Sequence, residues 1–400
     1  MELTTIEKSC SLHARIGWQG LTRKEYLEQG DYYLVTGVDF ENGRIAFDRC
    51  HYVTKDRYEQ DSHIQIGIDD ILVTKDGTIG KVAIIDKQLD MPATLNSGVF
   101  VVRPKDKERL LPSYLKYALE SGCFNRFIEK IKVGCTIAHL NQEKFLKWEF
   151  PLPDVEKQRN IVNIFDKLSF ILDKQQQELN KMDMLIKARF VELFGDSFIN
   201  NCNWEKLKIA QAVTVEPQNG MYKPQSDYVT DDTGIPILRI DGFYDGKVKN
   251  WTTLKRLNCS NNDLEKYLLV DDDIVINRVN SIEYLGKCAH ITGMIEPTVY
   301  ESNMMRMHFD AARFNPIYIT RLLCTQYVYD QIVNHAKKAV NQASINQKDV
   351  LDFDVYQPPK ELQDQFADFV KQVDKSKVAV QKALDETKLL FDSLMQQYFG

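Results

Sequence analysis

The chain has 400 residues, of which 44% are hydrophobic and 27% are charged, and its formal net charge is −6. This length suits two domains better than one, and the composition is that of a globular protein rather than a disordered or fibrous one. The longest apolar runs, such as Leu268–Val270, are far too short to span a bilayer, and the N-terminus lacks the basic and apolar segments of a secretory signal.

The eight cysteines and seven histidines are scattered, and no Cys-x-x-Cys pair occurs. A zinc site and a disulfide framework are therefore not expected, and a reducing cytoplasm is the expected compartment. The negative net charge argues mildly against a nucleic-acid partner. Much of the acid, however, lies in short runs such as Asp271–Asp273, so a basic face elsewhere on the molecule is compatible with it.

Residues 1–150 are predicted to form a first mixed α/β domain. Apolar segments bounded by Gly, Asp or Pro predict strands at Tyr32–Thr36, Ile71–Thr74, Val82–Ile85 and Val99–Val102. A helix is predicted to begin at Pro112 and to continue through Lys130. Gly77–Lys81 lacks the spacing of a phosphate-binding loop, and Val82 replaces the Ser or Thr that should follow, so a turn between two strands is predicted there.

Residues 151–196 are predicted to form a long helix. The segment from Asp154 to Phe194 contains no Pro or Gly, Asp154 suits an N-cap, and Gly195 suits a C-terminal stop. Apolar residues recur at alternating steps of four and three, which is the heptad pattern of a coiled coil. The predicted seam consists of Ile161, Phe165, Leu168, Leu172, Leu179, Met182, Ile186 and Leu193, interrupted by the polar residues Gln175 and Arg189.

Residues 197–355 are predicted to form a second mixed α/β domain, with strands at Ile235–Ile240 and Asp273–Ile276 and a helix near Ile317–Ala336. Residues 356–400 are predicted to form a second long helix, which begins after Pro358-Pro359. Its seam consists of Phe366, Val370, Val373, Val380, Leu384, Phe391, Leu394 and Tyr398, interrupted by Lys377 and Thr387.

The second half of the chain repeats the first. Phe40 returns as Phe243, 203 residues later, and Leu140-Asn141-Gln142 returns as Ile345-Asn346-Gln347. From there a constant shift of 205 relates Pro153 to Pro358, Gln158 to Gln363 and Phe194-Gly195 to Phe399-Gly400. The helical parts of the two repeats align without insertions, whereas the sequences of the two domains diverge. This contrast favours one scaffold that carries two differently tuned binding surfaces over a duplication without functional meaning.

Each helix would run roughly 60 Å at about 1.5 Å per residue, and a helix of that length with one apolar stripe needs a partner. Because the two seams are alike, we expect the helices to pair with each other, antiparallel and with pseudo-twofold symmetry. The alternative is that each helix lies on its own domain.

No pattern indicates a catalytic site. Gln357–Lys360 has the wrong outer residues for the Asn-Pro-Pro-aromatic motif of amino-methyltransferases, and the acids near Pro153 are too close together for a nuclease metal site. We find no His-Glu-x-x-His motif, nucleophile, metal cluster or acid–base pair, which favours binding over catalysis.

The proline-rich helix starts and the helix ends carry a resemblance to a known family. The segments concerned are Pro151–Arg159, Pro358–Gln363, Glu192–Gly195, Gln397–Gly400 and Asp70–Lys81. Over essentially the whole chain, they resemble the specificity subunit of type I restriction-modification systems. The resemblance implies an α+β fold with two target-recognition domains, each of which reads one half of an interrupted double-stranded DNA site.

The resemblance further implies that the helices act as a spacer and dock two methylation subunits, and that restriction and translocation subunits complete the complex. S-adenosylmethionine, ATP and Mg would be cofactors of these partners, and none is expected on this chain. Two domains on one face of B-DNA would lie about 34 Å apart, and helix length would set that distance.

Candidate DNA contacts are expected on loops in the divergent parts, because Arg and Lys can pair with guanine and Asn and Gln with adenine. In the first domain they are Lys75, Thr78, Lys81, Lys132, Thr136 and His139. In the second they are Arg278, Asn280, Lys287, Lys337, Lys338, Asn341, Gln342 and Ser344. Arg278–Ser281 stands where the first domain has Lys75–Thr78, so the turn and any DNA contact there are not expected to be alike in both domains.

Each of these residues, taken singly, is equally compatible with a solvated surface side chain. Two other functions also stay open from the sequence: a self-contained DNA methyltransferase or nuclease, and a coiled-coil interaction protein without a DNA role.

Overall fold

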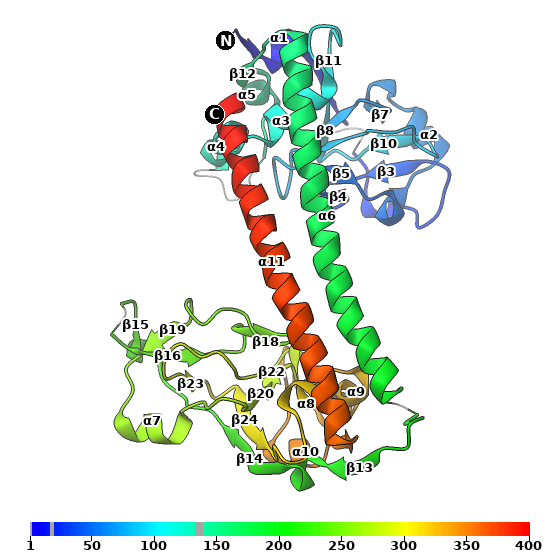
Figure 1. The fold of residues 1–400 in the computed structure, drawn as a ribbon. Coiled ribbons are helices and arrows are strands. Elements are labelled where there is room, and N and C mark those ends of the chain that lie inside the picture. Colours follow the sequence, from blue (N-terminus) through cyan, green and yellow to red (C-terminus); the bar gives the residue numbers. More distant parts are fainter. Residues whose placement is uncertain (1, 17–19, 133–138, 198, 232) are drawn as a thin grey trace. The chain divides into compact units, whose positions relative to one another are not determined.

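The computed structural model describes residues 2–16, 20–132, 139–197, 199–231 and 233–400. The chain divides into two compact units, residues 1–177 with 381–400, and residues 178–380. Each unit contains one globular domain and parts of both long helices, α6 (Val155–Phe194) and α11 (Lys360–Phe399) (Figure 1). Each globular domain therefore folds together with helical residues from both sequence repeats.

The first domain is a mixed α/β fold. Its helices are α1 (Ile6–Ser9), α2 (Lys55–Glu59), α3 (Pro112–Glu120), α4 (Gly122–Lys132) and α5 (Gln142–Leu146). Its strands are β1 (Leu3–Thr5), β2 (Cys10–Ala14), β3 (Tyr33–Val35), β4 (Phe40–Glu41), β5 (Arg44–Ile45), β6 (His51–Tyr52), β7 (Gln65–Ile66), β8 (Ile71–Thr74), β9 (Val82–Ile84), β10 (Ala93–Leu95), β11 (Val99–Pro104) and β12 (Glu149–Pro151).

The second domain has the same kind of construction. Its helices are α7 (Asn261–Tyr267), α8 (Pro316–Leu323), α9 (Gln326–His335) and α10 (Gln347–Leu351). Its strands are β13 (Glu205–Lys208), β14 (Val213–Asn219), β15 (Tyr228–Val229), β16 (Ile235–Leu238), β17 (Phe243–Tyr244), β18 (Gly246–Val248), β19 (Lys255–Leu257), β20 (Ile274–Asn277), β21 (Val279–Asn280), β22 (Cys288–His290), β23 (Val299–Tyr300), β24 (Met304–Phe309), β25 (Lys337–Lys338), β26 (Ala343–Ser344) and β27 (Asp354–Gln357).

The predicted strands are confirmed, with ends that differ by one or two residues. The turn predicted at Gly77–Lys81 is also confirmed, because it joins the antiparallel strands β8 and β9.

The single helix predicted from Pro112 through Lys130 is wrong. It is two helices, α3 and α4, because Ser121 is extended and its hydroxyl accepts a hydrogen bond from the backbone N–H of Phe124. A serine that binds the backbone in this way caps a new helix instead of continuing the old one.

The predicted helix near Ile317–Ala336 is likewise two helices, α8 and α9. The break lies at Thr325, whose backbone is extended and whose hydroxyl donates to the carbonyl of Leu322. Both domains thus place a helix pair at the same point of the repeat.

A central sheet with the order β2-β11-β8-β9 organises the first domain. Side chains alternate between the two faces of a strand, and here both faces are covered. Ile71 and Val73 of β8 belong to the core beneath α3, α4 and the long helices, whereas Leu72 belongs to the core shared with the β6-β3-β10-β7 sheet. This explains why β8 is a continuous run of buried residues.

The second domain contains the equivalent strand order, β14-β24-β20-β22, within a six-stranded sheet. Ile274 and Ile276 of β20 face the helical core, and Val275 faces the opposite core. In both domains a second sheet contains a parallel pair, β10 with β3 and β16 with β23. The sequence repeat is therefore a repeat of topology.

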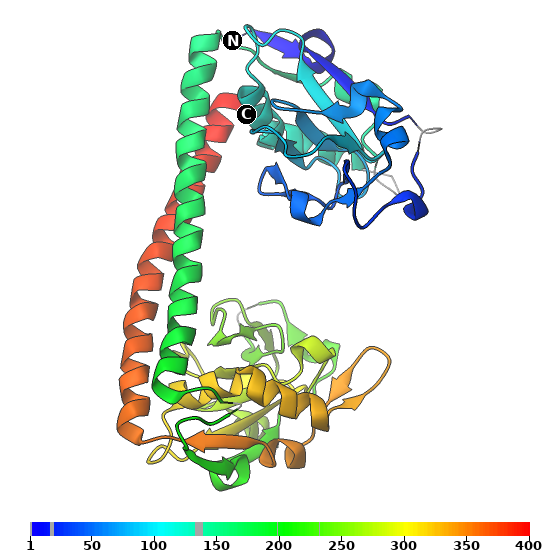
Figure 2. The same ribbon diagram turned by 90° about the vertical axis from the view of Figure 1, so that its right-hand side faces the viewer.

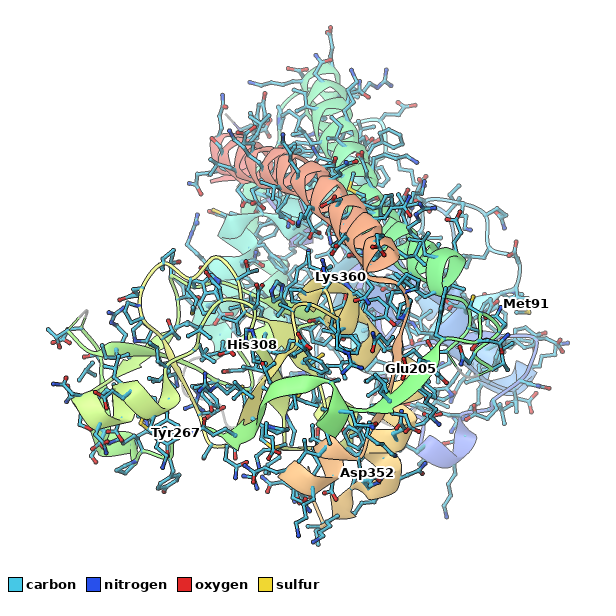
Figure 3. The ribbon with its side chains drawn as sticks, turned by 60° about the horizontal axis from the view of Figure 1, so that its bottom comes forward. Met91, Glu205, Tyr267, His308, Asp352 and Lys360 are labelled. Carbon is cyan, nitrogen blue, oxygen red and sulfur yellow. The ribbon has the colours of Figure 1, made fainter. Side chains whose placement is uncertain are left out.

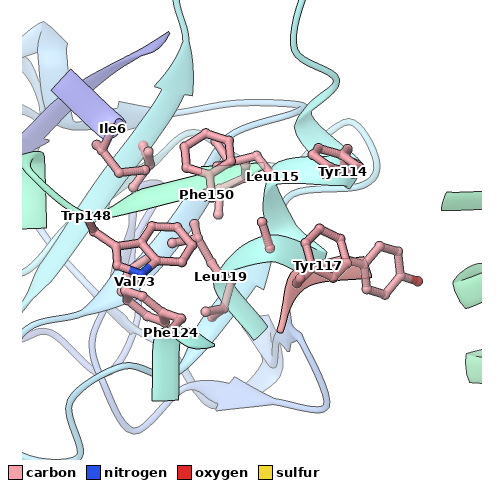
Figure 4. Close-up of a cluster of buried hydrophobic side chains, with 14 of the residues drawn as sticks. Ile6, Val73, Tyr114, Leu115, Tyr117, Leu119, Phe124, Trp148 and Phe150 are labelled. Atoms are coloured by element: carbon pink, nitrogen blue, oxygen red, sulfur yellow. The ribbon is translucent and has the colours of Figure 1, made fainter. Parts of the chain in front are cut away.

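Aromatic side chains fill the helical core of the first unit (Figure 4). Trp148 stacks on Phe150 and meets the edge of Phe124, at ring-centroid distances of 5.4 and 4.9 Å. The buried hydroxyl of Tyr114 donates to the carbonyl of Pro151 at 2.9 Å. This core joins the sheet to the start of α6 and the end of α11.

The ends of α6 agree with the sequence prediction. The Asp154 carboxylate accepts a hydrogen bond from the backbone N–H of Lys157 at 2.8 Å, as an N-cap does. Gly195 has a φ of +79° and its N–H donates to the carbonyl of Val191 at 2.8 Å, which closes the helix.

The two long helices pack antiparallel within each unit, as predicted (Figures 1 and 2). In the first unit Phe165, near the start of α6, meets Phe391, near the end of α11, with ring centroids 5.1 Å apart. In the second unit Phe190, near the end of α6, meets Phe366, near the start of α11, at 5.4 Å.

All the predicted seam residues of both helices are buried or half-buried, including the four polar ones. Three of those polar residues form a hydrogen bond or an ion pair with the other helix, and the Arg189 guanidinium lies over the Phe369 ring of α11. Gln175 donates to the Thr387 hydroxyl at 3.4 Å, and the Lys377 ammonium pairs with the Asp183 carboxylate at 2.5 Å. These partners offset the cost of placing polar groups in an apolar seam.

A buried glutamine joins α6 to the first domain. Gln158 is fully buried, and its side-chain oxygen accepts from the N–H of Leu111 at 2.9 Å. Its side-chain nitrogen donates to the carbonyls of Arg109 and Pro153, both at 2.8 Å. One side chain thus holds the loop before α3 against the start of α6.

The same set of three hydrogen bonds by one buried glutamine recurs in the second unit. Gln363 is fully buried, accepts from the N–H of Asn315 at 2.8 Å, and donates to the carbonyls of Arg313 at 3.0 Å and Pro358 at 2.8 Å. Figure 3 shows the side chains around this junction, with Lys360 labelled at the start of α11. The repeat therefore preserves an interaction as well as a topology.

We expect Gln158→Leu and Gln363→Leu each to lower the free energy of unfolding by about 1–3 kcal/mol, because each leaves one backbone N–H and two backbone carbonyls at a partly buried junction without this partner. Urea denaturation followed by circular dichroism measures the change. Gln372→Leu, at an exposed position of α11, is the control and should shift stability by less than about 0.5 kcal/mol. Equal effects in the control and the two variants would contradict a stabilising role for the hydrogen bonds of Gln158 and Gln363.

Leu179→Asp and Leu384→Asp should each destabilise the helix pair by about 3 kcal/mol or more, because these side chains are 7% and 2% exposed and a charge would enter the seam. Melting temperature measures the effect. Leu389→Asp, at a site that is 72% exposed, provides the matched control. An unchanged melting temperature in both seam variants would count against paired helices.

Candidate nucleic-acid interface

The second domain brings several of the predicted residues together on one small sheet. The order β21-β26-β25 places β26 in the middle, with Asn280 opposite Ala343 on one side and Lys338 opposite Ala343 on the other. Opposed residues share a face, so Asn280 and Lys338 lie on the same face of this sheet. Lys337, Ser344 and Val279 share the other face by the same register.

The hairpin between β25 and β26 carries the remaining predicted residues of this cluster. The N–H of Ala339 donates to the carbonyl of Gln342 at 2.7 Å, which continues the register and leaves Val340 and Asn341 at the tip. Asn341, Gln342 and both lysines are exposed. The structure therefore groups two cations and two amide side chains on one hairpin.

Arg278 lies at the base of this sheet. Its backbone accepts from the N–H of Ile345 at 3.0 Å and donates to Asn303 at 2.9 Å, and its guanidinium donates to the carbonyl of Ser302 at 3.1 Å. Lys287 is not part of the cluster. Its ammonium lies over the rings of Tyr284 and Tyr244, at 3.6 and 4.0 Å from their centroids.

Burial, and to a lesser extent the charge of Lys249, lowers the pKa of Lys287. Because this ammonium is already occupied by two aromatic faces, Lys287 is less available for a phosphate than the exposed lysines of the hairpin.

The first domain has the same backbone framework at the end of β8. Lys75 directly follows β8. Its backbone N–H donates to the carbonyl of Gly98, and its backbone carbonyl accepts from the N–H of Leu140, both at 2.8 Å. Asp76 forms an isolated antiparallel bridge with His139, and their side chains also contact each other. This bridge occupies the repeat position of the β21–β26 pair.

The other first-domain candidates are less clustered. Thr78 is exposed in the β8–β9 turn, and Lys81, at the end of that turn, is half-buried. Lys132 pairs with Glu129 on its own helix at 2.7 Å. Thr136 lies outside the described residues.

The two loops differ as the sequence comparison indicated. In the first domain Gly77 and Gly80 have positive φ angles of +68° and +85° and form a tight turn. In the second, the longer connection contains strand β21 before Gly286, whose φ is +75°. Strand β21 stands at the repeat position of Asp76-Gly77 and pairs with β26 of the exposed hairpin.

Two residues beside the cluster were missed by sequence reasoning. Tyr222 is 78% exposed in the loop after β14. Its neighbour Met221 accepts from the N–H of Ser302, and Ser302 also accepts from Arg278, so this loop adjoins the cluster. Val340 at the hairpin tip is the second. The signal that could have found it is an apolar residue directly before the amide pair Asn341-Gln342.

The acidic runs do not all contribute surface charge. Asp273 is 1% exposed and pairs with Arg306 and His308, each at 3.2 Å. Its repeat equivalent Asp70 pairs with the Arg103 guanidinium through two contacts of 2.7 Å. These carboxylates stabilise the sheets, and because each is paired with an arginine it adds no unpaired negative charge to the surface.

The long helices expose apolar side chains away from their seam. Met184 and Leu185 of α6 are 61% and 51% exposed, and Leu389 and Leu390 of α11 are 72% and 49% exposed. The two pairs are 205 residues apart, so they occupy the same position of the repeat. Each unit therefore presents one copy of the same exposed apolar pair.

In the described part of the chain, no group of three or more His, Cys, Asp or Glu side chains is arranged to hold a metal ion. Among the described helices, none is both long and apolar enough to cross a membrane.

Comparisons with known proteins agree with this architecture. A family model, the type I restriction modification DNA specificity domain, matches residues 20–182. The chain is 22% identical to the type I restriction enzyme EcoKI specificity subunit of Escherichia coli (strain K12), over 95% of this chain and 85% of that protein. It is 25% identical to the MjaVIII specificity subunit of Methanocaldococcus jannaschii, over 78% of this chain and 73% of that one.

Two solved structures are similar to the fold over almost its full length. One is the S subunit of a type I restriction-modification system from M. genitalium, with 15% identity, a TM-score of 0.57, and coverage of 100% of this chain and 96% of that chain. The other comes from work on complex assembly and conformational transition of the type I R-M system, with 15% identity, a TM-score of 0.55, and coverage of 99% and 96%. At this identity the likeness concerns the fold.

Proposed function

We propose that this chain, which belongs to the specificity-subunit family of type I restriction-modification systems, is the subunit that reads DNA sequence for such a complex. The observation that carries the proposal is the likeness to a specificity subunit over 95% of this chain and 85% of that protein. Two domains with one topology and different exposed loops suit this role, because each can read a different half of an interrupted site.

Recognition at base edges needs hydrogen-bonding side chains, and phosphate contacts need cations. The hairpin cluster of the second domain supplies both, with Lys337, Lys338, Asn341 and Gln342 exposed. In the first domain the exposed candidates are Thr78 in the β8–β9 turn and His139, which bridges Asp76 at the start of that turn. The length of the paired helices would set the spacing of the two half-sites.

The chain itself performs no chemistry in this proposal. Methyl transfer from S-adenosylmethionine belongs to methylation subunits, and ATP and Mg belong to the restriction and translocation subunits. The cytoplasm is the compartment in which such a complex meets the host DNA.

The repeated apolar pairs on α6 and α11 are the proposed docking points for two methylation subunits. Large apolar side chains that are half to three-quarters exposed are costly to leave in water and are typical of interfaces. Because the repeat gives each unit one equivalent pair, two copies of one partner can bind in the same way.

We expect a host that expresses this chain with its neighbouring methylation subunit to carry methyl-adenine in both halves of one interrupted motif. Genome-wide methylation mapping measures this, and deletion of the chain should abolish it. The purified chain alone, with DNA, S-adenosylmethionine and Mg, should neither methylate nor cleave. Methyl incorporation or cleavage by the lone chain would replace the proposal with a self-contained enzyme.

Replacing Met184 and Leu185 by Asp, or Leu389 and Leu390 by Asp, should each remove one of two bound methylation subunits. Burial of two such side chains corresponds to about 3 kcal/mol, so binding at the altered site should weaken about 100-fold. Native mass spectrometry of the assembled complex gives the stoichiometry. Val378→Asp, at another exposed position of α11, should retain both subunits. Two bound subunits in both variants would exclude these pairs as docking points.

A further inference from the structure

The β25–β26 ribbon has an apolar tip that the proposed function leaves unexplained. Val340 is 99% exposed, while Ala343 at the base of the ribbon is 3% exposed and packs in the helical core. The base is thus anchored and the tip stands in solvent. Figure 2 shows this hairpin, in orange, reaching out from the second domain.

The residue types along the ribbon are those that bind DNA in a groove. Lys337–Ser344 contains two lysines, two amide side chains and no acidic residue. The major groove is about 12 Å wide and admits a two-stranded ribbon. In that groove an amide side chain can bind adenine through two hydrogen bonds, and an apolar side chain can contact the methyl group of thymine. Asn341 follows Val340 at the tip and Gln342 pairs with Ala339 beside it, so both contacts can come from one tip.

We propose that this ribbon enters the major groove of the half-site read by the second domain, and that its tip reads an A·T base pair. Asn341 or Gln342 binds the adenine, Val340 contacts the thymine methyl group, and Lys337 and Lys338 bind the flanking phosphates. This inference rests on the proposed function and adds to it the reading element and the type of base pair.

The lysines have another physical role that must be separated from this one. Within the described part of the small sheet, β25 is an edge strand, and lysines on an edge strand discourage pairing with other chains. That role concerns solubility alone. It predicts no effect of Val340 on DNA binding and none of the lysines on its salt dependence.

The first test removes single methyl groups from the DNA. With the assembled methylation complex and its mapped target, each thymine of the second half-site is replaced in turn by deoxyuridine. The wild-type complex should lose affinity about fourfold at one position, the value expected for one buried methyl group. The Val340→Ala complex should bind the thymine duplex more weakly and show no further loss on the deoxyuridine duplex.

Val378→Ala is the matched control, because Val378 is 70% exposed on α11 and away from the ribbon. This variant should keep the fourfold sensitivity. An unchanged melting temperature of Val340→Ala shows that the tip does not contribute to folding. A Val340→Ala complex that keeps the full sensitivity to deoxyuridine overturns the inference, even if methylation of the two-part motif is intact. A complex that methylates no two-part motif overturns the proposed function itself.

The second test separates phosphate binding from solubility. Lys337→Ala and Lys338→Ala should each reduce the slope of log Kd against log salt concentration by about one, since each removes one phosphate contact. Light scattering of the free protein monitors association. An unchanged slope together with increased association would assign the lysines to edge protection and overturn their role on DNA.

Discussion

The buried amide near the start of each long helix is the interaction on which the two units depend. Gln158 and Gln363 each bind one backbone N–H and two backbone carbonyls at the junction between a domain and a long helix. A side chain that binds three groups on two segments fixes both their distance and their orientation, because all three hydrogen bonds must form together. The amide thereby holds the start of each long helix against the segment that precedes the first helix of the domain's helix pair.

The seam between the helices depends on polar pairing as well as on apolar packing. An all-apolar seam tolerates shifts in register, whereas a buried polar residue has few places where it is satisfied. Gln175 with Thr387 in the first unit, and Lys377 with Asp183 in the second, each supply one such position. The interruptions in the heptad pattern are therefore part of what specifies the antiparallel pairing.

The two domains show how a duplicated scaffold can acquire different surfaces. Lys75 and Arg278 hold equivalent backbone positions at the ends of β8 and β20, with matching hydrogen bonds to the chain before α5 and α10. Beyond these anchors the first domain forms a tight glycine turn between β8 and β9, whereas the second domain has strand β21 at that position. Changes in such a loop leave both cores untouched, so the target of one domain can diverge without loss of the fold.

The sequence by itself determined the repeat, both long helices with their seams, and the strands that are buried on both faces, because periodicity and helix caps act locally and survive in any context. It was wrong about helix continuity at Ser121 and Thr325, where hydroxyl groups bind the local backbone and break the helix. Only the tertiary structure decided that Asn280 and Lys338 share a face, that Lys287 is held between two tyrosines, and that Gln158 spans two segments. Such contacts join residues far apart in the chain, and no local pattern encodes which distant backbone group will lie opposite a given side chain.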